Sequence, residues 1–302
     1  MKFLNLIRWK NLMMIALVQL LIKYALLETF GVQTALDSLG ILLLIFSTIC
    51  IAAAGNIIND IFDVQTDSIN KPDKIVIGKS ISEKTAFNLF IALNVIGVGV
   101  GFYISHRVGQ PAFFSVFVVI SALLYIYASY LKGIALVGNI VVSALVSTSV
   151  LIVGLFELTP NLTDLNRDIQ IIFFKIILNY AVFAFMINLL REIAKDIEDV
   201  GGDYKAGLRT LPILIGRERT KNVLSVLHLA PLCLLIFYCI SELYNQQISL
   251  IYFLIGIIGP LIYVSMKLFQ AKTKSDFRHI SCVYKLIMLF GMLSLLLYKF
   301  VI

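Results

Sequence analysis

The sequence predicts an all-α polytopic membrane protein with nine transmembrane helices. Of its 302 residues, 60% are hydrophobic and 14% are charged, whereas a soluble domain has about 25% charged residues. Nine apolar segments approach the roughly 20 residues that a helix needs to span a bilayer. No linker rich in Pro, Gly or Ser separates them, so a single integral membrane domain is expected over residues 1–302.

The nine predicted spans are joined by short connections. They cover Leu12–Leu27, Leu39–Phe62, Ala86–Ser105, Pro111–Leu131, Ile134–Phe156, Ile169–Leu190, Asn222–Ile240, Ile248–Phe269 and Ile280–Ile302. Gly97, Gly99 and Gly101 in the third span and Pro260 in the eighth suit membrane helices, because small residues permit close packing and proline permits kinks.

The basic residues predict the orientation of these spans. Of the 25 Lys and Arg residues, all but five lie at the N-terminus or in and around the connections after even-numbered spans; the five exceptions are Lys23, Arg107, Arg167, Lys175 and Lys299. The positive-inside rule places the basic side in the cytoplasm. Topology and anionic lipid headgroups therefore explain the net charge of +7 better than nucleic acid does. A multi-pass protein of the cell (inner) membrane, without a cleavable signal peptide, is expected.

The cysteine and histidine residues do not suggest a metal site or a catalytic triad. Cys50, Cys233, Cys239 and Cys282 lie in or beside apolar segments without the spacing of metal ligands, so packing is the expected role. The three histidines are scattered along the chain.

Two acidic stretches stand out, one after the second span and one at the end of the sixth. The first reads NIINDIFDVQTDSINKPDK (56–74) and the second REIAKDIEDVGGDYKAGLRT (191–210). On a helix that turns about 100° per residue, the acidic positions of each stretch fall on one face. The acidic positions are Asp60, Asp63 and Asp67 in the first stretch, where Asn56 shares the same face, and Glu192, Asp196, Asp199 and Asp203 in the second.

Carboxylates stacked on one helix face repel one another unless a cation lies among them. Both stretches are predicted to lie on the cytoplasmic side, so we expect one shared site for polyvalent cations. Mg²⁺ combines carboxylates with substrate phosphate oxygens, and two such ions can clamp a diphosphate. Interleaved basic residues such as Lys71, Lys195 and Arg209 favour a metal–diphosphate site over a site for metal alone. The alternative is that these are solvated charges beside membrane helices.

These motifs resemble those of the UbiA superfamily of intramembrane prenyltransferases. The first stretch is similar to the NDxxDxxxD signature, here Asn59, Asp60, Asp63 and Asp67. The second is similar to the KDxxDxxxD block followed by GxxTLP, from Lys195 to Pro212. Between them Tyr130, Lys132 and Gly138-Asn139 resemble a further segment of the family. The resemblance covers nearly the whole chain and implies a UbiA-like fold.

The resemblance implies Mg²⁺-dependent transfer of a prenyl group from an isoprenyl diphosphate to a lipophilic acceptor. Asp63, Asp67, Asp199 and Asp203 would be the catalytic metal ligands, with Asn59 binding the magnesium-diphosphate and Asp60 and Asp196 as further ligands or their partners. Lys132, Lys195 and Arg209 would neutralise diphosphate oxygens. Arg8 has the same implied role, with membrane anchoring as the alternative. Aromatic rings stabilise an allylic cation. Of the aromatic residues expected nearby, only Tyr130 gains support from the family pattern; the others are Phe62, Tyr125, Tyr127, Phe183 and Phe185.

The residues around the two motifs indicate which acceptor is used. The residues FDVQTDSINKP, REIAKDIEDVGGD and TLP resemble most closely the digeranylgeranylglyceryl phosphate synthase branch, whose acceptor is a prenylated glycerol phosphate and whose role is phospholipid biosynthesis. Lys74-Ile75 departs from the Arg-Pro that many members show there. An aromatic acceptor of quinone biosynthesis is the alternative.

Two other function classes fit the sequence less well. A phosphatidyltransferase would need Asp-Gly followed by Ala-Arg, which neither acidic stretch contains. A cation-coupled transporter would place its acidic residues near the middle of the bilayer, whereas these lie at the cytoplasmic ends of two spans. The depth of Asp63 and Asp199 in the bilayer therefore distinguishes a transporter from a prenyltransferase.

Overall fold

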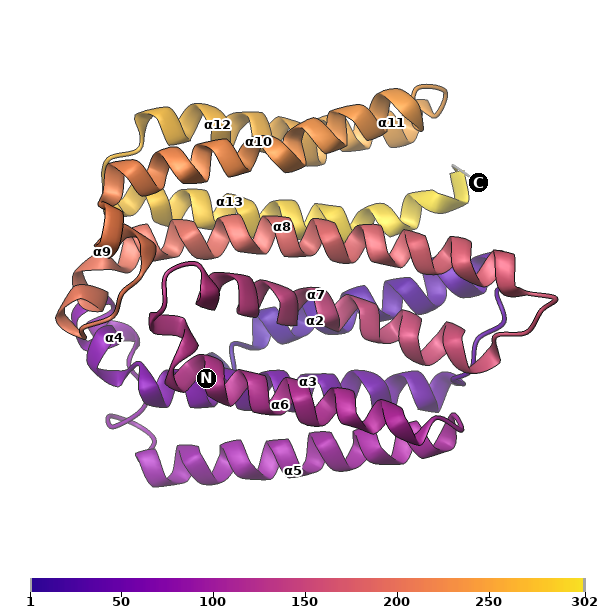
Figure 1. Ribbon diagram of the computed structural model, residues 1–302, viewed down its shortest axis with the longest axis horizontal. Coiled ribbons are helices and arrows are strands. Elements are labelled where there is room, and N and C mark those ends of the chain that lie inside the picture. The colour runs from indigo at the N-terminus through magenta and orange to yellow at the C-terminus, as the bar shows by residue number, and fades with distance from the viewer. Residues whose placement is uncertain (1, 301–302) are drawn as a thin grey trace. The chain divides into compact units, whose positions relative to one another are not determined.

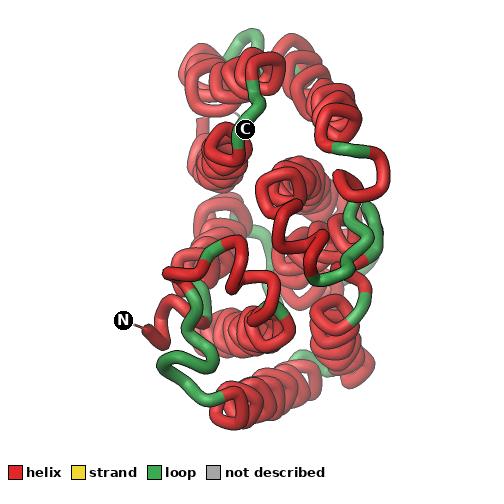
Figure 2. The backbone as a smooth tube through the Cα atoms, turned by 90° about the vertical axis from the view of Figure 1, so that its left-hand side faces the viewer, coloured by secondary structure: helices red, strands yellow, loops and turns green. Residues whose placement is uncertain are grey.

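Helices make up all the regular structure of residues 2–300, the part of the chain that this computed structural model describes; no strand occurs there (Figures 1 and 2). The α-helices are α1 (Lys2–Leu6), α2 (Trp9–Leu20), α3 (Ser38–Phe62), α4 (Val64–Asn70), α5 (Glu83–Arg107), α6 (Phe114–Ser129), α7 (Val137–Leu158), α8 (Arg167–Lys205), α9 (Leu211–Ile215), α10 (Arg217–Ser241), α11 (Gln247–Phe253), α12 (Gly259–Gln270) and α13 (Lys274–Leu293).

Nine helical segments within residues 2–300 are long and apolar enough to cross a membrane, which confirms the predicted number of spans. Two of them contain π-helical turns: α2 continues through a π-helical segment and a short 3-10 turn to Phe30, and α11 continues through a π-helical segment into α12. The sixth segment, α8, has 39 residues. This length exceeds what a bilayer requires, because the charged second acidic stretch extends the helix beyond its apolar part. The predicted end of the last span, Ile302, lies outside the described residues.

The side chain of Asp37 caps the N-terminus of α3. Asp37 accepts a hydrogen bond from the amide of Gly40 (2.8 Å) at the start of α3, and its other carboxylate oxygen pairs with Arg107 at the end of α5 (2.8 Å). The Gly40 hydrogen bond and the Arg107 charge hold the pKa of Asp37 below its usual range. Such N-caps satisfy amides that have no partner within the helix.

The chain divides into two compact units. The first extends to Lys132 and includes Thr148–Leu178; the second comprises Gly133–Ser147 and the chain from Asn179 onward. In the first unit, α3 packs against α2, α5 and α6 (Figure 1). A Cβ atom at Gly97 of α5 would lie 2.7 Å from Ile51 and 3.1 Å from the carbonyl oxygen of Ser47, so this crossing depends on glycine. Gly101 packs equally closely, whereas a Cβ at Gly99 would meet nothing within 4 Å.

A buried ion pair stabilises the first unit by linking α2 and its π-helical continuation to the end of α7. Lys23 and Glu157 are 1% and 0% exposed, and their charged atoms lie 3.2 Å apart. Lys23 also donates to Thr34 (2.8 Å) and to the carbonyl of Leu36 (2.6 Å), while Glu157 accepts from the Leu36 amide (3.1 Å). These bonds offset the cost of removing two charges from water, and they fix the connection that leads into α3.

The second unit has its own core, formed by α10, α12, α13 and the C-terminal part of α8. His228 of α10 is buried and bridges two other helices: one ring nitrogen lies 2.8 Å from the hydroxyl of Tyr284 and the other 3.0 Å from the carbonyl of Leu261. Because both nitrogens are occupied, a structural role for this histidine is indicated.

Candidate active site

The first acidic stretch is not one continuous helix, contrary to the sequence expectation. α3 ends at Phe62 and α4 begins at Val64, with Asp63 between them at φ −88° and ψ 0°. This backbone region is sparsely populated and recurs at active-site residues. Asn59 and Asp63 therefore belong to the end of α3, and Asp67 belongs to α4.

Asp63 lies at the centre of the contacts in this stretch. It is 8% exposed, and its Oδ2 atom accepts a hydrogen bond from the amide of Asn59 (2.6 Å) and another from the ammonium of Lys132. Lys132 comes from the turn that follows α6. Asn59, one turn earlier on the same helix, and Lys132, 69 positions further along the chain, thus fix the orientation of this carboxylate.

Asp60 and Arg8 form an ion pair, with 2.7 Å between the guanidinium and the carboxylate. Arg8 lies between α1 and α2 and has a left-handed backbone, φ 53°, which is costly for a residue other than glycine. The amide of Asn56 holds the same connection through the carbonyl of Ile7 (2.9 Å). Asp60 therefore orients Arg8, a contact that the spacing of the acidic residues did not indicate.

Asp67 has a different environment from Asp63. Burial, followed by repulsion from Asp63, raises the pKa of Asp67 above its usual value, and Lys71 and Lys132 partly oppose this. Asp60 and Asp67 line a small cavity of about 20 Å³ together with the segment 75–77. A cavity of this size holds about one water molecule.

The acidic positions of the second stretch all lie on one continuous helix, as expected, since α8 extends to Lys205. Asp196 accepts a hydrogen bond from the amide of Asn139 at the start of α7 (2.9 Å). Ser143 donates to the carbonyl of Asn139 (2.6 Å), and the buried Asn188 donates to Ser143 (3.2 Å). Asn188 and Ser143 were not identified from the sequence, although an Asn within an apolar span is itself a signal.

Asp199 and Asp203 follow Asp196 on α8. Asp203 is 5% exposed, and beyond it Gly207 takes a positive φ of 73°. This turn brings the backbone of Arg209 to Gly133, with a hydrogen bond of 2.9 Å between amide and carbonyl. The side chain of Arg209 is exposed.

Two further expected residues are placed as follows. Lys195 lies with its ammonium 2.9 and 3.0 Å from the two carboxylate oxygens of Glu192. Tyr130 is 69% exposed. The rings of Phe62 and Tyr125 meet edge to face, with 6.1 Å between their centroids.

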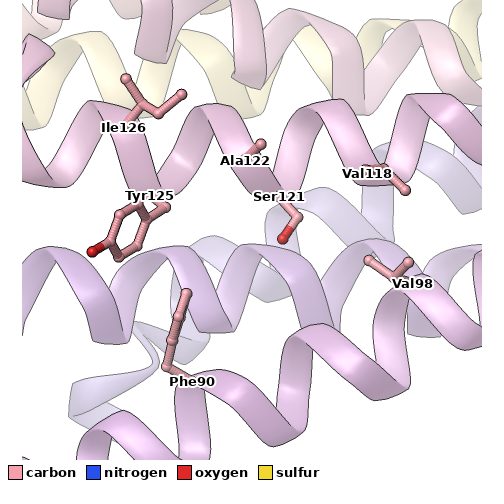
Figure 3. A pocket seen from close by; sticks show the side chains of 7 residues that line it. All are labelled: Phe90, Val98, Val118, Ser121, Ala122, Tyr125 and Ile126. Carbon is pink, nitrogen blue, oxygen red and sulfur yellow. The ribbon is translucent and has the colours of Figure 1, made fainter.

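An open groove of about 350 Å³ runs along α5 and α6 (Figure 3). Its lining is Phe90, Val98, Val118, Ser121, Ala122, Tyr125 and Ile126. Ser121 donates a hydrogen bond to Asn94 at 2.5 Å, so its hydroxyl proton is used within the protein. No acidic or basic residue lines the groove, so it is not a diphosphate site.

No group of three or more His, Cys, Asp or Glu side chains arranged to hold a metal ion is found in residues 2–300. Each acidic stretch does supply carboxylate oxygens, the ligand type that Mg²⁺ prefers. Since Mg²⁺ commonly completes its shell with water and substrate phosphate, the donor set fits an ion that arrives with a diphosphate.

Comparisons with known proteins agree with this chemistry. The model of the UbiA prenyltransferase family matches residues 17–299. The chain is 31% identical over 253 residues to the digeranylgeranylglyceryl phosphate synthase of Korarchaeum cryptofilum, covering 82% of this chain and 81% of that protein.

Solved structures share the fold. A digeranylgeranylglyceryl phosphate synthase structure superposes with a TM-score of 0.63 at 24% identity, covering 98% of each chain. A UbiA homologue from Archaeoglobus fulgidus bound to GPP and Mg²⁺ gives a TM-score of 0.57 at 19% identity, covering 98% of this chain and 99% of the other.

Proposed function

The chain belongs to the UbiA prenyltransferase family, and on that premise we propose that it transfers a prenyl group from an isoprenyl diphosphate to a prenylated glycerol phosphate, with Mg²⁺. The observation that carries this proposal is the environment of Asp63: a buried carboxylate oriented by Asn59 and Lys132. The pairing of a metal-binding carboxylate with a phosphate-binding ammonium suits a metal–diphosphate complex.

The remaining roles follow from the same contacts. Asp63 and Asp67 hold Mg²⁺ in the first stretch, and Asp199 and Asp203 hold it in the second. Asp60 and Asp196 orient their partners Arg8 and Asn139, which makes them supports of the site rather than direct ligands. That both stretches serve one diphosphate through two ions rests on the sequence, since both lie at the ends of even-numbered spans and so on one side of the membrane.

The reaction separates into steps with distinct requirements. The donor's C1–O bond breaks and diphosphate leaves with the bonding electrons; the acceptor hydroxyl oxygen then bonds to C1 and releases its proton. Bound Mg²⁺ would stabilise the charge of the leaving diphosphate. Lys132, Lys195, Arg209 and Arg8 contribute cationic donors to its oxygens. Tyr130 lies two residues before Lys132 and offers a ring to the developing allylic cation.

The acceptor and the location are inferred from the relatives and the charge distribution. The curated relative from Korarchaeum cryptofilum is named a digeranylgeranylglyceryl phosphate synthase, which supports a glycerol phosphate ether over an aromatic acceptor. The positive-inside rule supports an active site on the cytoplasmic side of the cell membrane. Family membership disfavours the transporter alternative.

An assay of the purified protein tests this proposal. Labelled prenyl diphosphates of several chain lengths are offered with a prenylated glycerol phosphate, hydroxybenzoate or a naphthoate, with Mg²⁺ or with EDTA. We expect Mg²⁺-dependent formation of the diprenylated glycerol phosphate and release of diphosphate. Transfer to the aromatic acceptors alone would refute the acceptor assignment, and activity in EDTA would refute the metal requirement.

A second measurement tests whether both stretches serve one diphosphate. Asp63→Asn, Asp199→Asn and the double variant are compared by donor binding at varied Mg²⁺ concentration. Residues that share one ligand show strongly non-additive effects. Additive losses would contradict a shared diphosphate.

A further inference from the structure

Arg191, Glu192 and Lys195 form a charged cluster on α8 in the second unit. One carboxylate oxygen of Glu192 lies 2.7 Å from Nη1 of Arg191 and 2.9 Å from Nζ of Lys195. The side chains of Arg191 and Glu192 are 17% and 14% exposed. The cluster thus brings two basic side chains to one carboxylate in a largely buried position.

Only one edge of the Arg191 guanidinium takes part in this arrangement. Its guanidinium engages Glu192 through Nη1, which leaves the opposite edge, formed by Nε and Nη2. Nε is buried, and no hydrogen-bond partner for it is found within the described part of the chain. A buried N–H without a partner is costly, and the Nε–Nη2 edge matches the spacing of two phosphate oxygens.

Arg191 is displaced from the proposed diphosphate ligands. Arg191 precedes Asp199 by eight residues, which is roughly 12 Å along the axis of a helix, and it lies on the side of the apolar span. An anion at Arg191 is therefore a different group from the donor diphosphate held at Asp199 and Asp203. In a prenyl transfer to a glycerol phosphate, the second anionic group is the phosphate of the acceptor.

We propose that Arg191, oriented by Glu192, binds the phosphate monoester of the acceptor. This inference rests on the proposed function and adds a specificity-determining residue to it. A phosphate recognised here anchors the acceptor by its headgroup while its prenyl chain remains among the helices. Glu192 fixes the guanidinium through Nη1 and so presents the Nε–Nη2 edge to the phosphate.

The test compares Arg191→Gln with a matched control, Arg217→Gln. Arg217 is exposed at the start of α10, so its replacement removes the same charge from the same unit without touching the cluster. The KM values for donor and acceptor are measured with the phosphate-bearing acceptor and with its phosphate-free alcohol. We expect Arg191→Gln to raise the KM of the phosphate-bearing acceptor by about ten- to a hundredfold, with the donor KM and the KM of the alcohol unchanged.

Arg191→Lys provides a second variant, which retains the charge but loses the planar edge. It should also raise the KM of the phosphate-bearing acceptor. If Arg191→Gln does not fold or does not bind the donor, Arg191→Lys is the variant that tests whether Arg191 binds the acceptor phosphate. An unchanged acceptor KM in the folded variant, or an equal rise for the phosphate-free alcohol, overturns the subsite but leaves the prenyl transfer standing. A wild-type protein that ignores phosphate-bearing acceptors overturns the proposed function and the subsite together.

Discussion

Lys132 donates a hydrogen bond to Asp63 from a position 69 residues further along the chain. The ammonium lies in the turn after α6 and the carboxylate at the junction of α3 and α4, so the packing of α6 on α3 sets their distance. The same carboxylate oxygen also accepts from Asn59. This arrangement leaves the other oxygen, Oδ1, for a further ligand.

Replacing Lys132 by Met should weaken donor binding more than acceptor binding. The substitution keeps most of the apolar length of the side chain but removes the cation next to Asp63. Donor affinity should fall by about tenfold or more, in line with the loss of a charged hydrogen bond. Measured KM values for both substrates check this, and Lys79→Met in the exposed connection after α4 serves as the control. Equal effects on donor and acceptor would contradict a diphosphate role for Lys132.

Arg8 and Asp60 should behave as one functional pair. Because Asp60 is the partner of Arg8, removing either side chain should impair donor binding, and removing the second should add little. Arg8→Met, Asp60→Asn and the double variant form a double-mutant cycle, with an expected coupling of about 0.5–3 kcal/mol in transition-state stabilisation. Independent effects would instead support Asp60 as a direct metal ligand.

Acid should destabilise the wild-type protein through Asp37. Its pKa is lowered by the Gly40 amide and by Arg107. A carboxyl with a lowered folded-state pKa adds stability above its unfolded-state pKa and loses it as the pH falls through the folded-state value. The thermal midpoint in detergent should therefore drop below about pH 4 in the wild type and less in Asp37→Asn. Asp164→Asn, in an exposed connection, should retain the wild-type pH profile.

Gly97 and Gly99 should respond differently to a methyl group. Gly97→Ala places a Cβ against Ile51 and the Ser47 carbonyl, whereas Gly99→Ala places one in open space on the same helix. Overpacking of this kind costs about 1–3 kcal/mol, so Gly97→Ala should lower the thermal midpoint and Gly99→Ala should not. Similar midpoints for both variants would show that α3 and α5 separate readily.

Much of the candidate site could be predicted from the sequence, because its residues form local patterns. The acidic positions recur at helical spacing within each stretch, and Lys132 and Arg8 were identified by the family resemblance. The interruption of the helix at Asp63 was not predicted, because the acidic residues continue at helical spacing beyond the apolar span that ends at Phe62. The contacts of Asn188 with Ser143 and of Lys195 with Glu192 also depend on rotamers and on neighbouring helices.

The sequence by itself determined the membrane spans and the two sets of carboxylates, because hydrophobic length and helical spacing are local properties of the chain. Only the tertiary structure decided which polar group each carboxylate meets: Lys132 for Asp63, Arg8 for Asp60 and Asn139 for Asp196. These partners lie 52 to 69 positions away along the chain, and the packing of helices brings them within hydrogen-bonding distance. A hydrogen bond requires partners placed to within a few tenths of an ångström, and residue spacing alone does not supply that information.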